Sequence, residues 1–172
     1  MMEAPHDDHV QMDYWLPLRA MVVDFISSSQ TPASLDKKVG LVSDKKKITN
    51  YGAAADGIKA WRGRKVITAS TIASQVWTSG GLSISVTPEL LISWPGSGPY
   101  VTKFYFSAEP LSKYMASPML RLLETTHGNL GTAAVLDAQR GKLHTGPTAR
   151  PADLDILLKT EASSFVAIWT SL

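Results

Sequence analysis

The feature that most constrains the fold is a short amphipathic helix that gives way directly to extended chain. Apolar residues recur there at the spacing of one helical face, namely Tyr51, Ala54, Ala55, Ile58 and Trp61. Thr49 or Asn50 can cap the first turn of this helix, and Gly63 can close the last one. From Lys65 to Val76 the chain is rich in β-branched residues, which favour a strand. The sequence therefore predicts a helix that packs on a sheet.

The centre of the chain predicts consecutive antiparallel strands. Between Leu82 and Thr87, apolar residues alternate with serine or threonine, as in a half-buried strand. The residues before it, Thr78–Gly81, form a turn of the hairpin type. Further strands are predicted at 90–94 and 100–106, and a second hairpin is predicted from 132–137 and 142–145.

Before the first helix, we expect a strand from Leu18 to Ile26, which the chain enters through Pro17. A helix is the alternative, because this run is apolar on both of its faces. Residues 27–44 contain several helix breakers and are predicted to be a loop.

A second helix is predicted at 118–126, with Ser117 as its N-cap and Pro118 at its first position. Because proline is not expected within a helix interior, residues 111–116 are predicted to be a separate turn.

Pro151 is predicted to start a short helix through Leu158, in whose first turn Asp153 and Asp155 favour the helix dipole. Residues 164–170 are predicted to close the chain as a strand. Three tryptophans are expected to anchor the core, namely Trp61, Trp94 and Trp169.

Together these elements predict an α+β fold with a mainly antiparallel, twisted sheet on which two to three helices pack. The 172 residues suit one domain at 13–172, preceded by a flexible acidic tail at 1–12. No apolar run approaches the length of a transmembrane helix, and no signal peptide is expected from the acidic N-terminus. The absence of cysteine excludes disulfide scaffolds and thiolate chemistry, and it fits the cytoplasm.

Charge is distributed unevenly along the chain. Residues 36–65 carry nine basic and three acidic side chains, a net charge of +6, whereas residues 1–35 carry one basic and five acidic ones, a net charge of −4. A molecule polarised in this way suits head-to-tail self-association or an anionic surface, and a merely solvated face is the other interpretation. The predicted membrane-binding or partner-binding residues flank the first helix and are Lys37, Lys38, Lys45, Lys46, Lys47, Arg62, Arg64 and Lys65.

No catalytic motif, phosphate-binding loop or nucleophile elbow occurs, so we expect no enzyme activity, no cofactor and no metal. His127 lies at a predicted helix end, where an imidazole can interact with the last carbonyls. Asp24 is unusual on an apolar strand and is expected at a strand edge or in a pair with Arg19. The run His6–His9 has metal-ligating residue types, but a flexible tail cannot pre-organise them.

The segment Thr49–Trp61 resembles the first core helix of rhabdovirus matrix proteins. In that family an early strand precedes such a helix, and an apolar segment and antiparallel hairpins follow it. The corresponding pieces here are 18–26, 51–61, 65–76 and 82–106. The resemblance is one of element order and texture over roughly 90 residues.

This resemblance implies a non-enzymatic structural protein of the virion, found also in the host cytoplasm or at the inner membrane face. Such proteins self-associate, bind the inner leaflet and condense a nucleocapsid. The implied partners are further copies of the chain, a viral nucleoprotein, a peripheral anionic membrane surface and, without specificity, nucleic acid. The chain departs from the pattern in its short acidic N-terminus and in lacking a Pro-Pro-x-Tyr or Pro-Thr-Ala-Pro motif, which suits a plant-infecting member better than an animal one.

Two other functions stay open at this point. One is a small soluble interaction module, similar to an immunity or inhibitor protein, with one protein partner. The other is a hydrolase or transferase whose site is assembled from scattered residues such as Asp24, His127 and His144. A pocket that joins any two of these residues would favour this hypothesis.

Overall fold

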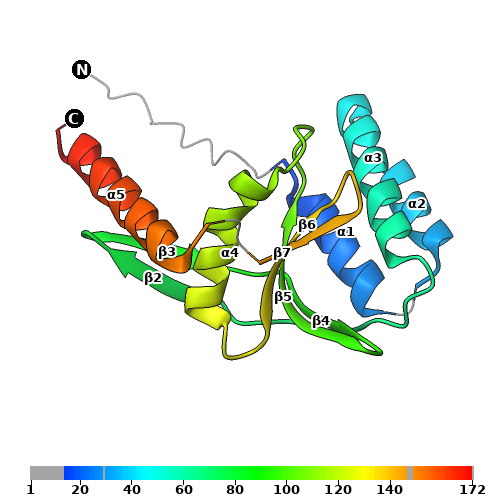
Figure 1. Ribbon diagram of the computed structural model, residues 1–172. Coiled ribbons are helices and arrows are strands. Elements are labelled where there is room, and N and C mark those ends of the chain that lie inside the picture. The colour runs from blue at the N-terminus through cyan, green and yellow to red at the C-terminus, as the bar shows by residue number, and fades with distance from the viewer. Residues whose placement is uncertain (1–13, 29, 147–148, 172) are drawn as a thin grey trace, which may run out of the picture.

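A five-stranded sheet lies at the centre of the computed structural model, which describes residues 14–28, 30–146 and 149–171 (Figure 1). In spatial order its strands are β1 (Thr68–Ser70), β4 (Leu90–Trp94), β5 (Ser97–Tyr105), β6 (Thr132–Asp137) and β7 (Lys142–Thr145). β5 and β6 are parallel, and the other neighbours are antiparallel. The strands β2 (Gln75–Ser79) and β3 (Leu82–Val86) form a separate antiparallel hairpin. The predicted α+β class with a mainly antiparallel sheet is confirmed.

The described residues form five helices rather than the two to three expected. They are α1 (Leu16–Ser27), α2 (Pro32–Gly40), α3 (Lys45–Arg62), α4 (Lys113–His127) and α5 (Pro151–Thr170). In Figure 1, α1, α2 and α3 lie on one side of the sheet, α4 lies on the other side, and α5 extends outward beyond α4, alongside the β2–β3 hairpin. The described chain forms one domain, and none of its helices is long and apolar enough to cross a membrane.

Two clusters of buried side chains fill the spaces between these layers. One joins α1, α2 and α3 to the sheet and contains Phe25, Tyr51 and Ile92. The other lies beneath α4 and contains Leu120 and Val135. Alternate residues of each strand face opposite sides of the sheet, so a single sheet serves both clusters.

The prediction of a strand at Leu18–Ile26 is wrong, because these residues belong to α1. Its buried residues are Leu18, Val22, Phe25 and Ile26. Their spacing of four, three and one residues places them on one helical face. Pro17 lies in the first turn of α1, where a backbone N–H has no helical partner to lose.

The predicted loop at 27–44 contains the helix α2. Pro32 starts this helix after Thr31, and the buried residues Leu35 and Val39 lie one turn apart. A Thr-Pro pair can mark the start of a helix as well as a turn. Here the burial of Leu35 and Val39 favours the helix.

The apolar face predicted for α3 is confirmed, because all five of its residues are buried. The helix starts earlier than predicted: its N-cap is Asp44, whose carboxylate accepts hydrogen bonds from the N–H groups of Lys46 at 2.8 Å and Lys47 at 3.3 Å. Gly63 ends the helix with a φ of 48°, as predicted. The prediction of Thr49 or Asn50 as the cap is therefore wrong, and Lys45 lies within the first turn.

α4 is one helix that contains Pro118, so the separate turn predicted at 111–116 is wrong. Its N-cap is Ser112 rather than Ser117, and its side chain accepts a hydrogen bond from the N–H of Met115 at 3.1 Å. The hydroxyl of Ser117 donates to the carbonyl of Lys113 at 2.8 Å, one turn earlier in the helix.

The strand predicted at 164–170 is wrong, because α5 continues through it. Trp169 is 70% exposed and is not a core residue, whereas Trp61 is buried and Trp94 packs against the first cluster, as predicted. The strand predicted at 65–76 is divided between β1 and β2, which belong to different sheets. Both predicted hairpins are confirmed. The predicted tail at 1–12, with the His6–His9 run, lies outside the described residues.

Candidate functional site

The predicted basic residues gather at the two ends of α3. Lys45, Lys46 and Lys47 form its first turn, and Arg62 is its last residue, followed by 64–65. An α-helix of 18 residues is about 27 Å long, so these are two clusters and not one. Lys37 and Lys38 lie on the neighbouring helix α2.

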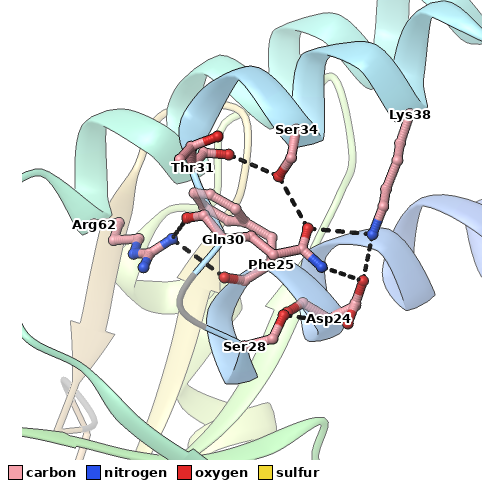
Figure 2. A network of polar contacts seen from close by, with 8 residues as sticks. All are labelled: Asp24, Phe25, Ser28, Gln30, Thr31, Ser34, Lys38 and Arg62. Atoms are coloured by element: carbon pink, nitrogen blue, oxygen red, sulfur yellow. Dashed lines mark hydrogen bonds and ion pairs between the residues drawn. The ribbon is translucent and has the colours of Figure 1, made fainter.

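Arg62 is half-buried, and its guanidinium bonds to other parts of the fold. Figure 2 shows its guanidinium pointing toward the end of α1, where Nη1 donates to the carbonyls of Phe25 at 3.2 Å and Gln30 at 2.9 Å. The guanidinium carbon also lies 4.4 Å from the centroid of the Phe25 ring. These contacts tie α3 to the α1–α2 connection, so Arg62 has a structural role there.

Lys38 belongs to the same network (Figure 2). Its ammonium group pairs with the carboxylate of Asp24 and donates to Gln30 Oε1 at 3.2 Å, while Gln30 Nε2 donates to Asp24 at 2.8 Å. Hydrogen bonding to Lys38 is the main reason that the pKa of Asp24 is lowered. The expected pair of Asp24 with Arg19 is wrong, because Arg19 Nε lies 3.1 Å from the carboxylate of Glu89.

Lys47 and Lys65 form cation–π contacts with aromatic rings. Lys47 Nζ lies 5.2 Å from the ring centroid of Tyr14. Lys65 donates to the carbonyl of Trp61, and its Nζ lies 5.3 Å from the Trp61 ring and 5.8 Å from the Trp94 ring. Both residues are half-buried, as expected for lysines whose aliphatic stems pack along apolar surface.

Four of the eight basic residues are exposed and form no ion pair with a described residue. They are Lys37, Lys45, Lys46 and Arg64. The first turn of α3 contains no acidic residue. Positive charge at a helix N-terminus opposes the helix dipole, at a cost of about 0.3–1 kcal/mol per group. Lys45 and Lys46 therefore lie where stability alone does not favour lysine.

An exposed leucine accompanies these lysines. Leu41, at the end of α2, is 77% exposed and lies four residues before Lys45, and Ile48 in the next turn is 37% exposed. Leu41 is not conspicuous in the sequence, because it lies in the region 27–44 that is predicted to be a loop, where only the charges are distinctive. We call Leu41, Lys45, Lys46 and Ile48 the α2–α3 tip.

The last turns of α5 carry a second exposed apolar surface. Phe165, Ile168 and Trp169 are 54%, 63% and 70% exposed, and the Phe165 and Trp169 rings are stacked with centroids 6.2 Å apart. Together with Leu82 of the β2–β3 hairpin, Phe165 and Trp169 line an apolar groove of about 360 Å³. We call the three exposed side chains the α5 patch. It lies at the opposite end of the molecule from α2 and α3 (Figure 1).

A buried carboxylate, which no pattern in the sequence indicates, joins α1 to the sheet. The side chain of Glu89 is only 4% exposed, and its Oε1 lies 3.1 Å from Arg19 Nε and 2.8 Å from Lys103 Nζ. Its Oε2 accepts from the N–H of Phe104 at 2.8 Å. The group is fully paired, as a buried charge must be, and it is explained as part of the fold.

The three residues of the hydrolase hypothesis have separate surroundings. Asp24 belongs to the network of Figure 2. His127 is buried at the end of α4, with Nε2 at 3.0 Å from the carbonyl of Ala73 and Nδ1 at 2.7 Å from Thr126 Oγ1. It thus bonds to another segment, not to the last carbonyls of its own helix as expected. His144 lies on β7 beside the first half of α4. Among the described residues, no three His, Cys, Asp or Glu side chains are grouped to hold a metal ion.

No protein-family model matches the sequence, and no curated protein is significantly similar to it. Functional conclusions for this chain therefore depend on the chemistry of its own surfaces.

Proposed function

We propose that this protein is a non-enzymatic assembly protein of the viral matrix type, which self-associates and binds anionic membrane through the α2–α3 tip. The observation that carries the proposal is the exposed Leu41 at the end of α2, followed four and five residues later by the exposed Lys45 and Lys46, which form no ion pair with a described residue. A peripheral membrane site needs basic groups for the anionic headgroups and an apolar side chain for the acyl boundary. The tip offers both on one loop and one helical turn.

The α5 patch supports self-association. Its three side chains are large and apolar, they are contiguous along the last turns of one helix, and more than half of each is exposed. Contiguous exposed apolar surface of this kind marks interaction sites. Because the patch and the tip lie at opposite ends of the molecule, a copy bound to membrane by its tip keeps its patch available to other copies (Figure 1).

Co-sedimentation with liposomes tests the membrane part of the proposal. The full chain should bind vesicles that contain phosphatidylserine and not vesicles of phosphatidylcholine alone, and binding should fall as salt rises from about 0.1 M to about 1 M. Each basic residue contributes about 1 kcal/mol near an anionic surface, so K45Q with K46Q should weaken binding about 30-fold. L41S should weaken binding to the same vesicles without changing its salt dependence.

The matched control is R150Q with K159Q, which removes the same charge from exposed positions of and beside α5. This variant should bind nearly as well as the parent protein. Binding that ignores lipid charge, or equal losses in both double variants, would contradict a membrane role for the tip.

The second candidate is an interaction module with one protein partner, which the α5 patch also favours. The two candidates differ in what happens to the protein alone. A module stays a monomer or small oligomer at micromolar concentration, whereas an assembly protein grows in mass with concentration. Light scattering at near-physiological salt distinguishes them.

A further inference from the structure

A small cationic cavity lies between the start of α4 and β7, apart from the elements that build the tip and the α5 patch. Its volume is about 230 Å³, far more than the roughly 10–15 Å³ that one water molecule needs. The residues that line it include Lys113, Lys142 and His144, with Ala116 and Leu120 of α4. The two lysine side chains reach it from exposed positions, one from each element.

His144 is the unusual member of this cavity. It is opposite Val135 in the β6–β7 register, and Val135 belongs to the buried cluster beneath α4. His144 is only 5% exposed, and its Nε2 is buried with no hydrogen-bond partner among the described residues. Buried polar nitrogens nearly always have a partner, and the exceptions point to a bound water, ion or ligand.

The surroundings of this imidazole are positive. Burial lowers the pKa of His144 most, and the charges of Lys142 and Lys113 lower it further, so both ammonium groups act on the ring. Asp137 acts in the opposite direction. Its carboxylate is already engaged, since Oδ2 accepts from the N–H of Leu111 at 3.1 Å and Oδ1 lies 3.4 Å from Arg140 Nη1.

We propose that this cavity binds a small phosphoryl ligand, either inorganic phosphate or a soluble phosphate monoester. Two ammonium groups and one imidazole N–H supply separate donors to different oxygens of a tetrahedral dianion. A carboxylate ligand would fit this cavity less well than a phosphate, because it has only two oxygens for three donors and only one negative charge for two ammonium groups. Nε2 of His144 has almost no accessible surface in this structure, so the ring turns toward the cavity before its Nε2–H donates to the ligand and the nitrogen gains its partner. The cavity is bounded by a helix and a strand, and its size suits a small ligand better than a nucleic-acid backbone.

The test is titration of the full chain with inorganic phosphate, at constant ionic strength maintained with chloride. Calorimetry should give saturable binding of one phosphate per chain, and the ring nitrogen signals of His144 should shift along the same curve. K113Q with K142Q should weaken binding at least 10-fold. Both lysines are exposed, so this variant should keep the thermal midpoint of the parent protein.

The matched control is K45Q with K46Q, which removes the same charge from the tip. It should leave phosphate binding unchanged, because those lysines belong to other elements. Non-saturable binding, an unchanged His144 signal, or equal weakening by the two double variants would overturn the proposal.

Competition distinguishes the two sources of the phosphoryl group. Glycerol phosphate that displaces phosphate at lower concentration identifies a monoester, and equal or weaker displacement identifies the free anion. Either result supports the cavity. Phosphate that fails to bind, while phosphatidic acid vesicles bind in a manner that requires Lys113 and Lys142, would replace the small-ligand site by a membrane contact and overturn the proposal.

Discussion

The backbone of Gly57 in α3 lies directly against the carbonyl of Ala138, which follows β6. A Cβ atom at Gly57 would overlap the Ala138 oxygen and would lie 2.7 Å from the carbonyl carbon of Gln139. This contact fixes how closely α3, with its basic ends, approaches the sheet. We therefore expect G57A to lower the free energy of unfolding by about 1–3 kcal/mol, because helix and turn must separate. Urea unfolding monitored by tryptophan fluorescence measures it.

Gly52 is the matched control, because it lies in the same helix and has no neighbouring atom within 4 Å of an added Cβ. G52A should raise stability by about 0.5–1 kcal/mol, since alanine loses less backbone entropy in a helix than glycine. A loss of stability in G52A equal to that in G57A would mean that the cost does not come from the Ala138 contact.

Glu89 gives a second prediction about stability. E89A removes a nearly buried carboxylate and leaves the N–H of Phe104 and the charges of Arg19 and Lys103 without it. We expect a loss of about 2–4 kcal/mol in the free energy of unfolding, measured by urea titration. D56N removes a carboxylate that is 75% exposed and pairs with Lys59 on the surface, so it should cost less than about 1 kcal/mol. Similar losses in both variants would contradict the role assigned to burial.

Local sequence patterns predicted the strands at the centre of the fold but not the helices α1 and α5 near its two ends. At both ends the sequence suits a strand as well as a helix, so only tertiary packing decides between them. The α3 face and the strand at Leu82 each have one periodicity, and that periodicity decides the structure. The apolar run at Leu18–Ile26 fits a strand or a helix. Only the packing of α1 against α2 and the sheet selects the helix. In α5, β-branched and aromatic residues after 164 favour a strand by propensity, yet a helix places Phe165 and Trp169 one turn apart and stacks them.

The candidate sites show the same limit. The lysines at the start of α3 could be read from composition, because charge clusters are visible in any sequence. Leu41 could not be recognised in this way, because it is notable only for being 77% exposed, and the sequence does not show exposure. The unpartnered nitrogen of His144 depends on α4 covering β7, a tertiary contact between elements that β6 separates in the chain. Arg62 and Lys38 were predicted to bind partners, but their contacts with the α1–α2 connection were not visible in the sequence.

His144 predicts how stability changes with pH. Its pKa in the folded protein is lowered, mainly by burial, so the unfolded chain binds its proton first as the pH falls. Stability is unaffected above the ordinary histidine pKa of about 6.5 and is lost as pH falls below it, until the folded form also binds the proton. In phosphate-free buffer, urea unfolding at pH 7.5 and 5.5 should show a smaller loss for H144N than for the parent protein.

Two features make this comparison specific. Every other titrating group is present in both proteins, so the difference between their pH dependences isolates His144. Added phosphate should raise the stability of the parent protein at pH 7.5, where phosphate is mainly the dianion, and should raise that of H144N less, because a ligand of the folded state stabilises it. Identical pH dependences for the two proteins would show that the His144 pKa is not lowered by folding.

The α5 patch predicts that assembly and stability can be separated. Since Phe165 and Trp169 are more than half exposed, F165S with W169S should change the free energy of unfolding by only about 0.5 kcal/mol for each residue. The same change removes the stacked apolar surface, so the mass measured by light scattering should stop rising with concentration. I156S is the control: Ile156 is 65% exposed and lies nine residues, or two and a half turns, before Phe165, on the opposite side of α5. Assembly that survives the double variant but is lost in I156S would place the contact on the other side of the helix, because only that side would then bury apolar area between copies.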